Sequence, residues 1–322
     1  MTSLVIVGAG RIATEYTLAL KHLGITPVIV GRGDESADAL ERRCGVKVMR
    51  GGLESYVESG HSPELAIIAV DHLDSFRLSK MLLEARPRAL LLEKPGALRL
   101  EELEELRTLA DSLCEDTRIA LNRRYLLSIR QTRQFLQASG SPIERVHVTF
   151  DERISRLRKS DLPPAVLERW IWVQSIHVID AALHLSGDDV SNVLKATRQG
   201  RLPWHPSGSR FLTDAELRSG VPIRFNADWR RDGLWSIYIV TQDFEVRLAP
   251  IEEAYIKDRS PASSPWRPLY RPSEPLVKNA AVIKPGFVDM VQDFVDGSPK
   301  NLPSVDQHLD LARLIFDVAG YE

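Results

Sequence analysis

The residues best suited to chemistry follow a short apolar run, Leu90 to Leu92, which ends in Glu93, Lys94 and Pro95. A run this short, bounded by prolines, is typical of a buried strand. Pro95 ends the strand and fixes the path of the backbone that leaves it. Because ligands of open parallel sheets bind beyond the carboxyl ends of the strands, Lys94 is a candidate catalytic cation. The alternative is an ordinary surface pair of Glu93 and Lys94.

A second candidate cluster lies in the apolar segment from Trp170 to Gly187, whose spacing predicts a helix that ends at the glycine. His177, Asp180 and His184 stand at positions i, i+3 and i+7, on one helix face. Three interpretations remain open: a metal site, for which no fourth ligand is evident, a core histidine bonded to a neighbour, or a catalytic histidine. A histidine near its unperturbed pKa of about 6.5 can exchange a proton at neutral pH.

A glycine-rich turn follows the first apolar strand, Leu4 to Val7, and precedes a helical pattern. The turn reads G-x-G-x-x-A over residues 8–13. Gly8 permits a tight turn, Gly10 lets the backbone approach a pyrophosphate, and Ala13 allows close packing of helix on strand. Because a helix N-terminus favours anions, this pattern predicts a dinucleotide-binding site.

The second strand, Pro27 to Val30, ends in Gly31 and Arg32. NAD-binding folds usually place an acid at this strand end for the ribose 2′-hydroxyl, whereas an arginine suits a 2′-phosphate. Gly31 occupies the acid position, and the guanidinium of Arg32 can make a paired contact with phosphate. The sequence therefore favours NADP over NAD. The nearby Asp34 keeps NAD open, and Arg32 as a solvated loop residue is the other alternative.

The wider pattern predicts an α/β chain with two domains. Strands alternate with helices up to about residue 121, which predicts a parallel sheet covered on both faces. Beyond it, strands follow one another and predict an α+β domain with an open, largely antiparallel sheet. We therefore expect a Rossmann domain over residues 1–121 and a substrate-binding and oligomerisation domain over 122–322. Closing helices within 285–320, one of them capped by Ser304, are expected to be able to pack back on the first domain.

Composition narrows the class of protein. The chain has 322 residues and a net charge of −2, so neither nucleic acid nor a membrane surface is an expected partner. Cys44 and Cys114 show neither a disulfide framework nor metal spacing, and we predict no metal. We expect no signal peptide, because no basic segment precedes an apolar one, and no apolar run nears the ~20 residues that span a bilayer. These features predict a cytoplasmic protein.

Three motifs together resemble the Gfo/Idh/MocA oxidoreductases: G-A-G-R-I-A at residues 8–13, E-K-P at 93–95 and N-R-R-Y at 122–125. The resemblance covers the whole chain. It implies that Lys94 lies near the nicotinamide and the reacting carbon, and that the open sheet forms a homodimer or homotetramer. The predicted cofactor contacts are Gly8, Gly10, Arg11, Ile12, Gly31, Arg32, Val70, Glu93, Lys94 and Pro95.

The family carries a D-x-x-x-H-x-x-D motif on the helix of the second cluster. His177 matches its histidine, which the resemblance makes a proton donor or acceptor, and Asp180 matches the later aspartate. Val173 stands where the first aspartate is expected. The orientation of His177 must then be set by another group, for which Gln174 and Lys94 are candidates.

The predicted function is hydride transfer between a nicotinamide and an oxygen-bearing carbon of a sugar, sugar derivative or similar small molecule. Lys94 and His177 would handle the proton. The alternatives are an NAD-linked dehydrogenase and a non-catalytic NAD(P)-binding sensor or assembly protein, for which Val173 is the best support. The predicted substrate contacts are Arg123, Arg124, Tyr125, Trp170, Trp172, Gln174 and Asp180, with Trp204 and His205 as further candidates.

Overall fold

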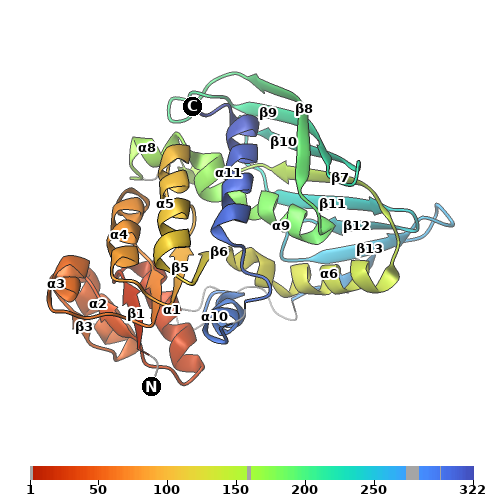
Figure 1. The fold of residues 1–322 in the computed structure, drawn as a ribbon. Helices are drawn as coiled ribbons and strands as arrows, with labels where there is room; N and C mark the ends of the chain where they lie inside the picture. Colours follow the sequence, from red (N-terminus) through yellow and green to blue (C-terminus); the bar gives the residue numbers. More distant parts are fainter. Residues whose placement is uncertain (1–2, 158–160, 273–282, 298) are drawn as a thin grey trace. The chain divides into compact units, whose positions relative to one another are not determined.

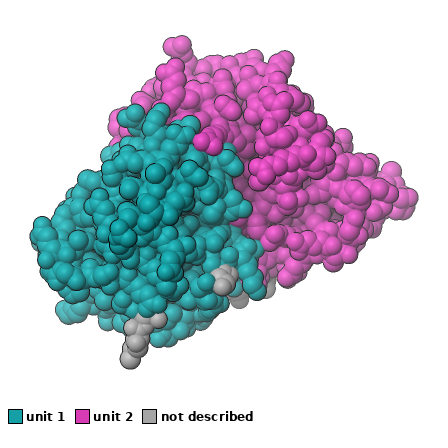
Figure 2. All heavy atoms as spheres, in the orientation of Figure 1, with its two compact units in different colours: residues 1–122, 280–310 teal, residues 123–279, 311–322 magenta. Residues whose placement is uncertain are grey.

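The computed structural model describes residues 3–157, 161–272, 283–297 and 299–322. The chain divides into two compact units, coloured separately in Figure 2. The first unit comprises Met1–Asn122 and Ala280–Asp310, and the second comprises Arg123–Asn279 and Leu311–Glu322. Each unit is therefore assembled from two separate stretches of sequence.

The first unit contains a six-stranded sheet in the order β3-β2-β1-β4-β5-β6, in which every neighbouring pair is parallel (Figure 1). Its strands are β1 (Leu4–Val7), β2 (Val28–Val30), β3 (Val48–Met49), β4 (Leu65–Ile68), β5 (Ala89–Glu93) and β6 (Asp116–Ala120). All residues of β1 and β4 are buried, as in sheets that helices cover on both faces. The strand order reverses between β1 and β4, which is where such sheets bind their ligands. The predicted Rossmann fold is confirmed.

The helices of the first unit are α1 (Arg11–His22), α2 (Asp34–Cys44), α3 (Gly52–Glu58), α4 (His72–Glu84), α5 (Leu100–Leu113) and α10 (Phe287–Val295). A further helix, α11 (Val305–Ala319), begins in the first unit and ends in the second. Ser304 caps α11 as predicted: the Gln307 N–H donates to Ser304 Oγ at 3.3 Å, and the Ser304 N–H donates to Gln307 Oε1 at 3.0 Å. This reciprocal pair is a capping box.

The second unit contains an eight-stranded sheet in the order β14-β13-β12-β11-β7-β10-β9-β8. Its strands are β7 (Ile143–Phe150), β8 (Val190–Gln199), β9 (Arg210–Leu217), β10 (Pro222–Asp228), β11 (Trp235–Thr241), β12 (Phe244–Leu248), β13 (Ala254–Asp258) and β14 (Arg267–Tyr270). Only β7 and β10 pair in parallel, so the predicted open, largely antiparallel sheet is confirmed. The sequence pattern does not predict β9, β13 or β14.

One face of this sheet is covered by α6 (Leu127–Ser139) and α9 (Ile176–Ser186), which pack on β13 and β14 and on β7 and β11 respectively. The short helices are η1 (Asn122–Tyr125), which begins at the last residue of the first unit's first stretch, and α7 (Ile154–Leu157), α8 (Pro164–Leu167) and η2 (Ile171–Ser175) of the second unit. The uncovered face is polar: Asp214, Arg224, His147, Tyr238 and Arg247 lie side by side across five neighbouring strands. Inward-facing residues of β7, such as Val148, are buried.

None of the helices in the described ranges is long and apolar enough to cross a membrane. Cys44 and Cys114 are free thiols, the first buried and the second half-buried.

Candidate active site

The glycine turn after β1 has the geometry that a dinucleotide needs. Gly8 has a backbone φ of +120°, and a Cβ at this position would lie 2.2 Å from the carbonyl oxygen of Ala69. The same Cβ would lie 3.3 Å from Val70, so the turns after β1 and β4 touch. Gly10 precedes α1 and has open space around it, and no side chain caps this helix end. The residues present therefore fit an anion such as a pyrophosphate at the N-terminus of α1.

The turn after β2 excludes an acidic side chain at its first position. A Cβ on Gly31 would lie 2.8 Å from the Cβ of Ala9 and 3.0 Å from Val48, closer than packed side chains allow. Arg32 follows, with 73% of its side chain exposed, and its Nη2 lies 3.1 Å from Asp74 Oδ2. An exposed pair of this kind is weak, so Arg32 can exchange it for another anion at little cost.

The motif that carries Lys94 is held on both sides. The Tyr16 hydroxyl donates to Glu93 Oε1 at 2.6 Å, and the Gly96 N–H donates to the Glu93 carbonyl at 3.0 Å. On the other side, the fully buried His308 donates from Nε2 to the carbonyl oxygen of Pro95 at 2.9 Å. Lys94 itself is half-buried at the end of β5. Its backbone is therefore fixed by α1 before it and α11 after it.

The surroundings of Lys94 are buried and charged. Burial raises the pKa of Glu93, while its hydrogen bond from Tyr16 and the charges of Lys94 and Lys284 oppose this rise. Burial and the charge of Lys94 lower the pKa of His72, the first residue of α4, to about 3. His72 therefore stays neutral at physiological pH beside the lysine.

His177 lies in the second unit, and the helix around it differs from the single helix that the sequence predicts. Residues Ile171–Ser175 form a turn of π-helix, in which the Ile176 N–H bonds to the carbonyl of Ile171, five residues back. α9 then begins at Ile176. His177 is 6% exposed, and its ring centroid lies 6.2 Å from that of Trp235. Val173, in the π turn, is buried. The wider π turn has no distinctive apolar spacing, which is why the pattern does not predict it.

Two of the predicted substrate contacts bind each other. Arg124 donates from Nε to Asp180 Oδ2 at 2.9 Å and from Nη2 to Asp180 Oδ1 at 2.6 Å. Their side chains are 15% and 2% exposed, so this is a buried bidentate pair.

Burial and the charges of Arg124 and Arg133 lower the pKa of His184 to about 3. Within the described residues, no group of three or more acidic, histidine or cysteine side chains is arranged to hold a metal.

Most of the aromatic candidates lie in the core. Trp172 is fully buried and meets Phe316 edge-on at a centroid distance of 6.1 Å. His205 is also fully buried: its Nδ1 donates to the Gly208 carbonyl at 3.1 Å, and its Nε2 accepts from the Tyr321 hydroxyl at 2.7 Å. These contacts favour core packing over substrate binding for both residues. Tyr125 and Trp170 are buried too, whereas Trp204, Arg123 and Gln174 are half-buried.

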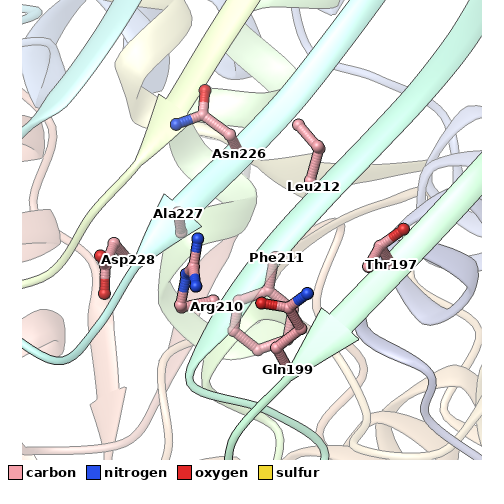
Figure 3. A pocket seen from close by; sticks show the side chains of 8 residues that line it. All are labelled: Thr197, Gln199, Arg210, Phe211, Leu212, Asn226, Ala227 and Asp228. Atoms are coloured by element: carbon pink, nitrogen blue, oxygen red, sulfur yellow. The ribbon is translucent and has the colours of Figure 1, made fainter.

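A pocket of about 240 Å³ lies on the sheet of the second unit (Figure 3). Its lining comes from β8, β9 and β10, and comprises Thr197, Gln199, Arg210, Phe211, Leu212, Asn226, Ala227 and Asp228. None of the predicted site residues is among them.

Sequence reasoning misses the residues that hold the candidates in place. Tyr16 and Glu93 are 77 residues apart, and His308 and Pro95 are 213 apart. No spacing rule joins residues so distant. The only indication in the sequence is the residue type. Tyr16 lies in a helix that must be buried and His308 lies in an apolar helix, and buried polar side chains need hydrogen-bond partners.

Comparison with known proteins adds to this geometry. Residues 2–115 match the family model described as an oxidoreductase family with an NAD-binding Rossmann fold. No curated protein matches the chain.

Solved structures match over nearly the whole chain. An oxidoreductase from Agrobacterium radiobacter, in complex with NAD+, L-tartaric acid and magnesium, is 15% identical with a TM-score of 0.77. Levoglucosan dehydrogenase with NADH and levoglucosan is 17% identical with a TM-score of 0.78. UDP-N-acetylglucosamine 3-dehydrogenase from Acidithiobacillus ferrooxidans is 13% identical with a TM-score of 0.73. Each alignment covers 99% of this chain and 96% of the other. At these identities the likeness shows a shared fold.

Proposed function

We propose that this chain is a Gfo/Idh/MocA-type oxidoreductase, because residues 2–115 match the model of that family's NAD-binding fold, and we propose the reaction that it catalyses. The reaction is hydride transfer between a nicotinamide cofactor and an oxygen-bearing carbon of a sugar, sugar derivative or similar small molecule. The likeness in fold to dehydrogenases of levoglucosan and of a nucleotide sugar supports this substrate class. We also propose a cytoplasmic location, which two free cysteines suit.

The cofactor, when bound, supplies the hydride chemistry. The chain supplies the rest. The open space at Gly10 and the uncapped start of α1 suit a pyrophosphate, and Val70 lies against the same turn. Lys94 would polarise or protonate the substrate oxygen, and His177 would carry the proton.

The observation that carries the proposal is the fixed position of Lys94. Lys94 stands at the carboxyl end of β5. In the sheet β5 neighbours β4, and β4 neighbours β1; the carboxyl ends of β1 and β4 mark the switch point of the sheet. Tyr16 and His308 hold the residues on either side of it. An ordinary surface lysine does not need such support, because a preorganised charge matters only where a reacting group must be placed.

Replacing Lys94 tests the proposal. With the nicotinamide cofactors and a panel of sugars and ketosugars, Lys94→Met should lower kcat by roughly 10²–10⁴-fold, the range of general acid catalysis. Cofactor affinity, followed by calorimetry, should change little. Lys47→Met is the matched control, since Lys47 is 93% exposed in the same unit. If wild type and variant are equally inert while both bind cofactor, the protein is a non-catalytic nucleotide-binding protein.

We propose further that NADP is preferred to NAD. The crowding at Gly31 leaves no room for the acid that would accept from a ribose 2′-hydroxyl, and Arg32 stands next to it with a weak exposed partner. Arg32→Ala should weaken NADP binding roughly tenfold or more and leave NAD binding unchanged, since a hydrogen bond to a charged group contributes about 1.5–3 kcal/mol. Titration calorimetry of both cofactors, with Arg42→Ala as control, decides. Tighter binding of NAD by the wild type would refute the preference.

A further inference from the structure

Glu152, just beyond β7, is a buried carboxyl that the proposed reaction does not use. It is 8% exposed. Its Oε1 accepts a hydrogen bond from the Ser175 hydroxyl at 2.8 Å and another from Trp235 Nε1 at 3.1 Å. Burying a carboxyl is costly even with such donors, so its presence here calls for a reason.

Both hydrogen-bond donors of Glu152 lie close to His177, one along the chain and one in space. Ser175 ends the π turn that immediately precedes α9, and single π turns inside helices are frequent at functional sites. Trp235 is the aromatic ring beside the imidazole, with 6.2 Å between the centroids and 47° between the planes. One carboxyl oxygen therefore holds the turn that leads into His177 and the ring that lies next to it.

The loop that carries Glu152 is itself fixed. The Gly233 N–H donates to the Glu152 carbonyl at 3.0 Å, and the Asp228 N–H donates to Asp151 Oδ1 at 2.7 Å. A Cβ on Gly233 would lie 2.3 Å from the Cβ of Asp151, so only glycine fits between the two loops. Glu152 can therefore act as a fixed point to which Trp235 is tied.

We propose that Glu152 is a positioning residue for His177, acting through Trp235 and the turn at Ser175. It would take over the orienting task of the aspartate whose place in the D-x-x-x-H-x-x-D motif is held by Val173. The π turn accounts for the different orienting residue. The hydrogen bond from the Ile176 N–H to the Ile171 carbonyl spans five residues, and it shifts the preceding turn relative to α9. The inference rests on the proposed function in one respect, namely that His177 handles the proton.

The position of Glu152 also makes it sensitive to pH. Burial raises its pKa to about 7, against the hydrogen bonds from Ser175 and Trp235, which lower it. The charged group that acts on it is Asp151 on its own loop, with Asp228 and Arg231 beside that residue, while His177 on α9 lies next to its hydrogen-bond donor Trp235. The strand β11 contributes Trp235, which does not titrate.

Three variants test the proposal. Trp235→Phe keeps a ring but removes the donor, Glu152→Leu removes the acceptor, and Glu152→Gln keeps an accepting oxygen that cannot ionise. Glu144→Gln is the control, because it removes the charge of another carboxyl, on the strand β7 that leads to Glu152, which is 48% exposed and pairs with Arg259. The first readout is the titration of the His177 imidazole by NMR, assigned with His177→Asn, and it needs no substrate. The second is the pH profile of kcat.

Trp235→Phe and Glu152→Leu should shift the imidazole titration and lower kcat about tenfold or more, less than the roughly 10²–10⁴-fold of a general acid, with KM for the cofactor unchanged. Glu152→Gln should keep most of the rate and lose the inflection near neutral pH. If Glu152→Leu does not fold, Trp235→Phe alone decides.

The inference is overturned if Trp235→Phe and Glu152→Leu fold and leave both the His177 titration and kcat as in the wild type. An altered titration in a protein that turns over no substrate would instead support the coupling of Glu152 to His177 through Trp235 and Ser175, while refuting the proposed function.

Discussion

At the scale of single residues, burial decides which side chains can exchange protons near neutral pH. Burial is the largest cause that lowers the pKa of His72 and His184 to about 3 and of His205 to about 4. These histidines stay neutral under physiological conditions. Burial moves the pKa of Glu152 the opposite way, to about 7. Burial thus brings the pKa of the Glu152 carboxyl close to neutral pH and takes the pKa of these histidines away from it.

The buried carboxyl has a consequence for stability. Its pKa is about 7 in the folded chain against an ordinary 4.5, so the native state keeps a proton that the unfolded chain has lost between these values. Stability contributed by Glu152 is therefore full below about pH 4.5 and declines as pH rises to about 7. Glu152→Gln cannot ionise, and should become more stable than the wild type as pH rises, by roughly 3 kcal/mol at most.

Denaturant unfolding of both proteins at pH 5 and pH 8 measures this difference. Asp228→Asn is the control, because the hydrogen bond from Arg230 lowers the pKa of Asp228 to about 2, so this carboxyl is ionised at both pH values and its replacement should change stability equally at pH 5 and pH 8. A gain for Glu152→Gln that is the same at both pH values would contradict the raised pKa.

At the scale of elements, the end of β5 depends on two helices that come from opposite ends of the sequence. α1 supplies Tyr16, which also packs edge-on against Phe287 of α10, and α11 supplies His308. Removing either partner leaves a buried acceptor without its donor, which costs about 1–3 kcal/mol.

Tyr16→Phe and His308→Leu should each lower the free energy of unfolding by about this amount. If the two contacts also position Lys94, both variants should reduce kcat more than they weaken cofactor binding. Urea titration and steady-state kinetics measure the two effects. Tyr56→Phe is the control, a buried tyrosine of the same unit that stacks on His61. An unchanged free energy of unfolding in both variants would show that the hydrogen bonds of Tyr16 and His308 contribute nothing to stability.

The elements also show what sequence patterns can and cannot predict. Most strands of the first unit are short apolar runs between turn residues, which makes them predictable, whereas β6 begins with Asp116, Thr117 and Arg118 and only its end is apolar. β9 is not predicted because the polarity of its residues does not follow their burial. Leu212 is exposed while Thr213 is buried, so apolar and polar residues do not alternate clearly along the strand. The candidate residues Gly8, Lys94 and His177 follow from motifs, whereas Tyr16, His308 and Glu152 act through contacts that no local pattern contains.

At the scale of the whole molecule, the uncovered face of the second unit's sheet is the surface through which we propose a homodimer or homotetramer. The face carries a row of charged and polar side chains, with Arg224 donating to Asp214 at 2.6 Å, and it exposes 43% of Leu212. Leu212→Arg adds a long charged side chain to it and should lower the oligomeric state, because an unpaired charge in an interface is costly.

Sedimentation velocity over a range of protein concentrations measures the change. Leu73→Arg is the control, since Leu73 is 56% exposed on α4 of the first unit. A wild type that stays monomeric throughout the range would rule out the proposed assembly, and dissociation by both variants would argue against this face.

The division of each unit between two stretches of sequence bears on the order of events during synthesis. The ribosome releases residues 1–122 well before residues 280–310, so the first sheet emerges without α10 and without the histidine that holds Pro95. Most of the second unit is made in between. The nascent nucleotide-binding unit therefore stays incomplete until residues 280–310 have been made, and the motif that carries Lys94 acquires its second anchor only after them.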